Sequence, residues 1–152
     1  MENLERLLRE HDFLQGMTEE QTATIVSCAK NLRFGPGSFL MREGDDADTF
    51  YLLRIGRVVL EADIPGQGLV TMETVGPGDL LGLSWLFPPH RVQLGAVAAE
   101  TVVALVVHGA CVRGKMEADP ALGYALTRRL LAETYSRLQR VRLQRLDVYK
   151  GI

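Results

Sequence analysis

The pattern of apolar and polar residues divides the chain into three zones of different periodicity. Leucines at helical spacing predict a helical lead-in over residues 1–31. From residue 32 to 112, short β-rich runs alternate with turns of Gly, Pro and Asp, which is typical of an antiparallel sandwich or barrel. Helical spacing returns over residues 113–150. A chain of 152 residues can bury one sizeable core, so we expect a single domain spanning 1–152.

The last zone predicts a long helix that Asp119 can cap, with Pro120 at its first position. Its apolar residues form two tracks, and two tracks suggest two packing partners. One track comprises Leu122, Leu126 and Leu130, and the second runs through Tyr124, Leu131 and Leu138, with Val141 and Val148 beside it. We expect a homodimer through Leu131, Leu138 and Val141. The alternative is one wide face packed on the chain's own domain.

The net charge of −2 predicts no general attraction to polyanions or membranes. The charge is uneven, because residues 121–152 carry seven basic and two acidic side chains. No helix-turn-helix follows this segment and no aromatic residues interleave with its arginines, so we expect no nucleic-acid partner. The apolar stretch 94–107 is too short to span a bilayer, and no secretory signal is visible. We expect a cytoplasmic protein without a membrane partner.

The residues that usually carry chemistry are few and scattered. Cys28 and Cys111 are too far apart in sequence for a metal cluster, and we expect both to be reduced thiols. His11, His90 and His108 show no spacing typical of a metal site or a catalytic triad. We therefore expect no metal, no catalytic residue and no enzymatic activity.

Residues 39–58, FLMREGDDADTFYLLRIGRV, resemble the first signature of the cyclic-nucleotide-binding domain family, as found in catabolite-activator-type regulators. Every position of that signature is met except Met41, where Val, Ile or Cys is usual. Gly44 and Gly56 fall at turns where a positive φ is expected. The resemblance implies an α+β fold. Its core would be an antiparallel jelly roll, or double-stranded β-helix, flanked by N-terminal helices and a long C-terminal helix.

The resemblance also implies a phosphate-binding cassette, and here the sequence departs from the family. In the family a Gly-Glu pair opens the cassette, and the Glu accepts a hydrogen bond from the ribose 2′-hydroxyl. Gly82 matches this pattern, but Leu83 stands at the Glu position and Trp85 at a position where the family has a small residue. Trp85 could stack on a flat ligand ring or fill a collapsed pocket.

The second half of the cassette is expected to supply an Arg that pairs with the cyclic phosphate, followed by a small residue and Ala. Arg91 is followed instead by Val92 and Gln93. Counting back from Ala98 places Val92 or Gln93 at the Arg position. Three outcomes stay open: a different ligand, weak binding of a cyclic nucleotide, or no ligand.

We therefore expect a stand-alone sensor or regulatory domain in which a ligand repositions the long C-terminal helix. Its ligand need not be a standard cyclic mononucleotide, and no cofactor is expected other than such a nucleotide. The alternative is a dimerisation or protein-interaction module on the same fold, with no ligand. The candidate ligand-binding residues are Gly82, Leu83, Ser84, Trp85, Arg91, Val92 and Gln93.

Overall fold

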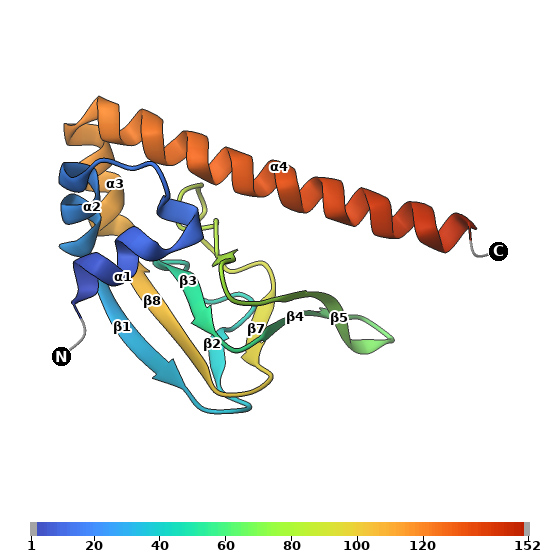
Figure 1. The fold of residues 1–152 in the computed structure, drawn as a ribbon. Helices are drawn as coiled ribbons and strands as arrows, with labels where there is room; N and C mark the ends of the chain where they lie inside the picture. Colours follow the sequence, from blue (N-terminus) through green and yellow to red (C-terminus); the bar gives the residue numbers. More distant parts are fainter. Residues whose placement is uncertain (1–2, 151–152) are drawn as a thin grey trace.

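A computed structural model describes the backbone of residues 3–150 and the side chains of residues 3–144. Two four-stranded antiparallel sheets lie beneath a layer of helices, and α4 runs along the top of the molecule (Figure 1). The first sheet has the strand order β1 (Ala29–Phe34), β8 (Val102–His108), β3 (Thr49–Ile55), β6 (Leu80–Leu81). The second has the order β2 (Phe39–Met41), β7 (Gly95–Ala98), β4 (Val58–Ile64), β5 (Gly68–Val75). The predicted α+β jelly roll is confirmed.

The helices cover the first sheet on its outer side. They are α1 (Leu4–Glu10), the 3₁₀ turn η1 (Asp12–Leu14), α2 (Glu19–Val26), α3 (Gly109–Ala118) and α4 (Pro120–Lys150). Helix α2 begins with a capping box, in which Thr18 and Gln21 exchange both side-chain to backbone hydrogen bonds. Asp119 caps α4 by accepting from the backbone amides of Ala121 and Leu122.

Residues 50–53 of β3 are buried on both faces of the strand, which explains their unbroken apolar run. Phe50 and Leu52 pack in a cluster with the helices, whereas Tyr51 and Leu53 pack in a second cluster between the two sheets. Successive side chains of a strand point to opposite sides, so both sides of β3 are core. The strand therefore joins the helical layer to the β-roll.

His11 fixes the end of the lead-in to this central strand. Its Nδ1 accepts from the Phe13 amide at 3.2 Å, so Nε2 carries the proton and donates to the Leu53 carbonyl at 2.9 Å. Burial lowers the pKa of His11, which keeps the ring neutral. This histidine has a structural role, in line with the absence of a metal-site spacing around it.

The turn glycines behave as expected. Gly44 and Gly56 have φ values of 89° and 86°. At Gly56 a Cβ would lie 2.2 Å from the Thr101 carbonyl oxygen, so that turn also excludes a side chain on steric grounds.

Two elements begin earlier than the predicted zone boundaries. Strand β1 starts at Ala29 because it pairs with β8 from there, with Ala29 opposite Val107. Helix α3 starts at Gly109 because the His108 side chain accepts from the Cys111 amide and caps it. The apolar run of β8 thus leads directly into a helix.

The two tracks of α4 lie in different environments. The inner track, Leu122, Leu126 and Leu130, is fully buried on the domain. The outer track and its neighbours are exposed: Tyr124, Leu131, Tyr135, Leu138, Val141 and Leu143. The alternative of one wide face packed on the chain's own domain is therefore wrong for the described side chains. Val148 lies outside them, and the homodimer stays a prediction.

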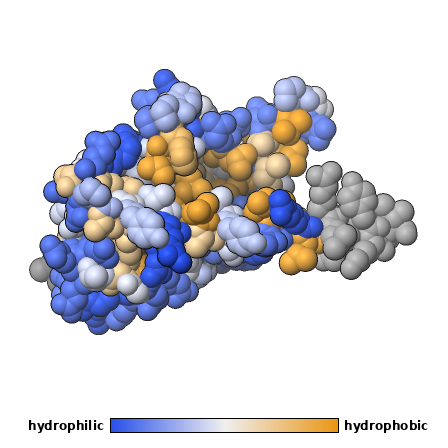
Figure 2. Space-filling view, turned by 90° about the horizontal axis from the view of Figure 1, so that it is seen from above, coloured by the Kyte–Doolittle hydropathy of each residue, from blue (hydrophilic) through white to orange (hydrophobic). Residues whose placement is uncertain are grey.

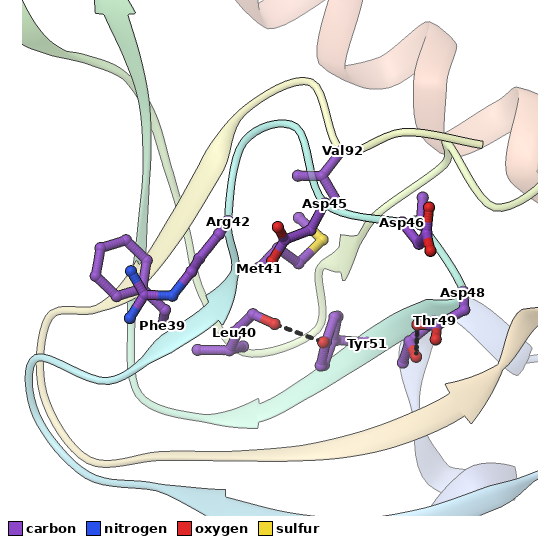
Figure 3. A pocket seen from close by; sticks show the side chains of 11 residues that line it. Phe39, Leu40, Met41, Arg42, Asp45, Asp46, Asp48, Thr49, Tyr51 and Val92 are labelled. Carbon is purple, nitrogen blue, oxygen red and sulfur yellow. Dashed lines mark hydrogen bonds between the residues drawn. The ribbon is translucent and has the colours of Figure 1, made fainter. Parts of the chain in front are cut away.

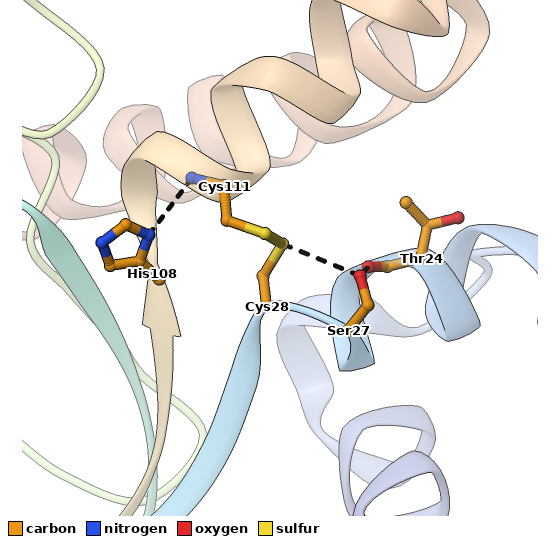
Figure 4. Close-up of a disulfide and its surroundings, with 5 residues drawn as sticks. All are labelled: Thr24, Ser27, Cys28, His108 and Cys111. Carbon is orange, nitrogen blue, oxygen red and sulfur yellow. Dashed lines mark hydrogen bonds between the residues drawn. A yellow bond between two sulfur atoms is a disulfide. The ribbon is translucent and has the colours of Figure 1, made fainter.

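Cys28 and Cys111 form a disulfide, so the expectation of two reduced thiols is wrong (Figure 4). Their Cα atoms are 5.7 Å apart although 83 residues separate them in sequence. The pairing of β1 with β8 is the reason: Cys28 precedes β1, and its carbonyl accepts from the His108 amide at the end of β8. Sequence separation alone cannot show this proximity.

The disulfide bears on where the protein functions. Disulfides persist in oxidising compartments and are rare in a reducing cytoplasm. The cytoplasmic location therefore stays a prediction, and this bond counts against it. Within the described part of the chain, the helices are each too short or too polar to cross a bilayer.

We predict that reducing the disulfide lowers the free energy of unfolding by about 2–4 kcal/mol, because a long loop is no longer closed in the unfolded chain. Urea unfolding with and without dithiothreitol measures this difference. The double variant Cys28→Ser/Cys111→Ser is the control and should be insensitive to dithiothreitol. Two thiols titrating in the untreated native protein would contradict the bond.

Candidate functional site

A cavity of about 170 Å³ lies between the second sheet, α4 and the segment 82–94, here called the cassette loop. We call it the cassette cavity. Five of the seven predicted site residues line it: Gly82, Leu83, Ser84, Val92 and Gln93. Its other lining residues are Met41, Ala47, Thr49, Leu60, Glu73, Leu81, Leu94 and Arg137. The lining is mostly apolar, which matches the low charge of the cassette loop.

Gly82 brings the start of the cassette loop close to β3. Its φ is +98°, and a Cβ there would lie 3.2 Å from the Thr49 carbonyl oxygen. A side chain would therefore be strained by the backbone and crowded by the sheet. This glycine keeps the loop against the floor of the cavity and lets Leu83 reach its wall.

Trp85 does not line the cassette cavity. It is fully buried, and its ring stacks on Phe50 with centroids 4.8 Å apart and planes 22° apart. Its Nε1 donates to the Gly82 carbonyl at 3.1 Å, and its own carbonyl accepts from the Arg113 guanidinium of α3. A Cβ on Gly109 would lie 2.8 Å from the Trp85 Cβ, so only glycine leaves room for this packing.

Arg91 also lies outside the cassette cavity. Its Nη1 is 2.5 Å from Asp46 Oδ1, and both side chains are more than half exposed. Ion pairs this exposed contribute little to stability because water screens them. Within the part of the chain that the structure describes, no arginine of the cassette loop therefore lines the cavity.

The charges in the cavity come from two residues that sequence reasoning missed, Glu73 of β5 and Arg137 of α4. The Arg137 Nε lies 4.0 Å from Glu73 Oε1 and 3.5 Å from Glu133 Oε1. Within the described residues, its Nε and Nη2 are buried and make no hydrogen bond. The sequence does contain an indication that Arg137 faces the domain. It follows Leu130 by seven residues and so continues the inner, buried track of α4.

A second cavity of about 270 Å³ adjoins the first and shares Met41, Ala47, Thr49 and Val92 with it. Figure 3 shows its acidic side, formed by Asp45, Asp46 and Asp48. The Tyr51 hydroxyl donates to the Leu40 carbonyl at 2.7 Å, and burial raises the pKa of Tyr51 to about 12. Among the described residues, no group of three or more His, Cys, Asp or Glu is arranged to hold a metal.

The family model for the cyclic nucleotide-binding domain matches residues 31–119. The chain therefore belongs to the cyclic nucleotide-binding domain family. That family consists of regulatory domains rather than catalytic ones.

Individual relatives agree with this assignment. Human cGMP-dependent protein kinase 2 is 24% identical over 107 residues, which is 70% of this chain but only 14% of the kinase. A Geobacter metallireducens protein described as cyclic nucleotide-binding is 31% identical, with a TM-score of 0.80 over 91% of this chain and 99% of that one. The catabolite activator protein of Thermus thermophilus shares the fold, with 24% identity and a TM-score of 0.69 over 91% of this chain and 63% of that one.

We predict that Trp85, the single tryptophan, reports on the core and not on the cavity. Its emission should be blue-shifted and poorly quenched by acrylamide. Trp85→Ala should cost about 3–5 kcal/mol of unfolding free energy, because it leaves a large cavity against Phe50. Urea unfolding measures the cost. Efficient quenching in the native state, or a loss below about 1 kcal/mol in a still folded variant, would contradict this placement.

Proposed function

We propose that the protein is a regulatory sensor domain whose cassette cavity binds a small molecule other than a standard cyclic mononucleotide. One observation carries the proposal. The cavity is lined by the cassette loop, yet Leu83 stands at the position of the ribose-binding Glu, and Arg91 pairs with Asp46 instead of lining the cavity. The site is thus present without the groups that recognise a cyclic phosphate in the family.

The free energies of the missing hydrogen bonds and the volume of the cavity both favour a ligand other than a cyclic mononucleotide. A hydrogen bond to a charged group contributes about 1.5–3 kcal/mol, and about 1.4 kcal/mol changes affinity tenfold. Loss of both the Glu and the Arg would therefore weaken cyclic-nucleotide binding by several powers of ten. The cavity volume of about 170 Å³ is also below the range of roughly 300–1,000 Å³ for drug-sized ligands. A whole nucleotide would need the loop or α4 to move.

Two helices are connected to the cavity, one through its wall and one through the cassette loop. Arg137 brings α4 into the cavity wall, and the Trp85 carbonyl ties the loop to Arg113 of α3. A ligand that contacts both walls has a different affinity for each position of α4, which is what a population shift requires. The proposed role is binding and regulation, without a catalysed reaction.

The exposed outer track favours a second candidate function, that of a dimerisation or interaction module. Figure 2 looks down on the α4 side and shows hydrophobic residues gathered there, up to the grey end of the helix. The described exposed residues of α4 include Leu131, Leu138 and Val141. A second copy of α4 could cover them at helical spacing. This role is compatible with ligand binding and would also serve a domain without a ligand.

We predict that neither cyclic AMP nor cyclic GMP at millimolar concentration raises the melting temperature. The double variant Leu83→Glu/Gln93→Arg should restore a shift of several degrees, because a ligand at about 100 times its dissociation constant stabilises by about 2.7 kcal/mol. Gln93 is the chosen Arg position because it is exposed at the cavity, whereas Val92 is buried. Differential scanning fluorimetry measures the melting temperatures of the wild type and of the double variant, with and without each nucleotide.

The matched control for that experiment is Leu83→Gln/Gln93→Met. It introduces uncharged side chains of similar size at the same two positions, and cyclic nucleotides should not shift its melting temperature. A clear shift of the unmodified protein with a cyclic mononucleotide would refute the proposed ligand class. It would also show that groups outside the cassette pattern suffice for cyclic-phosphate binding.

We predict that the protein is dimeric and that Leu138→Glu raises the dimer dissociation constant more than about tenfold. A carboxylate buried without a partner costs several kcal/mol, which exceeds the roughly 1.4 kcal/mol of a tenfold change. Sedimentation equilibrium measures the constant. Arg140→Glu, on an exposed position of the same helix, is the control for charge alone. A monomeric wild-type protein at high concentration would rule out this interface.

A further inference from the structure

We propose that the bond between Cys28 and Cys111 is a thiol-exchange site, at which a small dithiol reduces the folded protein through a mixed disulfide on Cys111. The proposal goes beyond the proposed function and does not depend on it, because the bond lies on a different cavity. Four observations carry it: a cavity beside the disulfide, the unequal burial of the two cysteines, the position of Cys111 in α3, and the hydrogen bonds around Cys28.

A cavity of about 530 Å³ lies beside the disulfide, and we call it the disulfide cavity. Its walls come from β1, β3, β8 and the first turn of α3, and both cysteines line it. It shares only Thr49 with the cassette cavity. Its volume falls within the range of roughly 300–1,000 Å³ that is usual for small-molecule sites. Because exposed disulfides are the ones that exchange readily, a cavity of this size gives a small thiol access to the bond in the folded protein.

The two cysteines differ in burial, and this difference selects the sulfur that is attacked. Cys28 is 8% exposed and belongs to the core cluster beneath the helices, whereas Cys111 is only partly buried against that cluster. Access is one of the factors that decide which sulfur of a disulfide reacts. The incoming thiolate therefore bonds to Cys111, and Cys28 is the leaving group.

Cys111 lies in the first turn of α3, where His108 accepts from its amide and caps the helix (Figure 4). The positive end of a helix dipole stabilises a thiolate, and reactive cysteines are often found at such helix ends. Once the bond is open, Cys111 is thus the sulfur that can attack another disulfide. The same residue accepts the reductant in one direction and regenerates the bond in the other.

The surroundings of Cys28 favour a protonated thiol. The Ser27 hydroxyl donates to the Thr24 carbonyl at 2.6 Å, and its Oγ lies 3.8 Å from the Cys28 sulfur (Figure 4). Because the hydroxyl proton is already donated, Ser27 Oγ can only accept from Cys28. The oxidised sulfur has no proton to give, whereas the reduced thiol does. Opening the bond therefore allows a hydrogen bond that keeps Cys28 as a neutral thiol.

The exchange is balanced by the dithiol itself. One of its thiols loses a proton to water, and the resulting thiolate forms a bond to the Cys111 sulfur. The bond between the two cysteines breaks, its electron pair goes to Cys28, and Cys28 takes a proton from water. The second thiol ionises in the same way and attacks the reductant's sulfur in the mixed disulfide, which releases Cys111 as a thiolate. The protein is reduced, and the dithiol is oxidised to a cyclic disulfide.

The charge at the disulfide cavity suits a thiolate. Lys30 lines the cavity two residues after Cys28, and no acidic residue is among its described lining. The attacking species is an anion, so a nearby ammonium group raises its local concentration. Lys30 is therefore expected to speed the attack at low ionic strength.

The rate at which dithiothreitol reduces the folded wild-type protein tests the proposal. Samples are quenched with acid, alkylated and counted for free thiols by mass spectrometry. We expect a rate proportional to the dithiothreitol concentration and unchanged by a little urea. If reduction required unfolding, about 1 M urea would accelerate it about fivefold or more, because it raises the unfolded population by that factor. Such an acceleration would overturn the proposal.

The single variants Cys28→Ser and Cys111→Ser test which sulfur reacts. They are a matched pair, because each lacks the bond and keeps one thiol. With hydroxyethyl disulfide at neutral pH, the Cys111 thiol should react roughly tenfold faster than the Cys28 thiol. Equal rates, or a faster Cys28, would overturn the assignment of the mixed disulfide to Cys111. Melting curves establish that each variant is folded.

Lys30→Glu tests whether the thiolate arrives through the disulfide cavity. At low ionic strength it should slow reduction of the wild-type bond about threefold or more, and added salt should weaken the effect by screening. Arg33→Glu is the matched control, since it makes the same charge change on β1 at a residue outside the lining. Equal rates for the two variants would overturn the route through the cavity. None of these measurements depends on a ligand in the cassette cavity.

Discussion

The stacking of Trp85 on Phe50 is the contact on which the rest of the site depends. It removes the largest side chain of the cassette loop from the cavity and places it in the core between the first sheet and the helices. The same residue holds the Gly82 carbonyl through its ring nitrogen and the Arg113 guanidinium through its carbonyl. The loop is therefore anchored near its start, and the residues at its two ends, 82–84 and 92–94, form the cavity wall. Gly109 permits this arrangement, since any side chain there would collide with Trp85.

The distribution of charge follows from that anchoring. In the family pattern the cassette loop itself carries the polar groups that meet the ligand. Here the loop offers an apolar wall, and Glu73 and Arg137 bring the charged groups from β5 and α4. The charged groups of the cavity thus lie on the surfaces that face the loop. Because Arg137 belongs to α4, the wall of the cavity and the outer apolar track are parts of the same helix.

Much of the fold could be predicted from sequence, because local patterns determine it. The signature over residues 39–58 predicted the jelly roll, and the spacing of apolar residues in α4 separated its inner track from its outer one. The disulfide could not be predicted, since it depends on the register of β1 against β8 rather than on spacing. The cavity was found only in part for the same reason. Five of the predicted loop residues line the cavity, whereas Trp85 is buried in the core and Arg91 pairs with Asp46. The two charged lining residues lie outside the motif.

The bond between Cys28 and Cys111 also determines where the molecule can bend. It joins the start of β1 to the first turn of α3, and the contact between Arg113 and the Trp85 carbonyl fixes the next turn of that helix. Helix α3 is thus held at successive turns, and the chain passes from it into α4 through Asp119, an extended residue between the two helices. From that pivot α4 continues for 31 residues, or about 46 Å at 1.5 Å per residue. A tilt of about 5° at Asp119 would carry the far end through about 4 Å. The covalent link therefore fixes the point from which α4 starts, and a tilt about that point would move the far end nearly twice as far as Arg137, which lies about 26 Å along the helix.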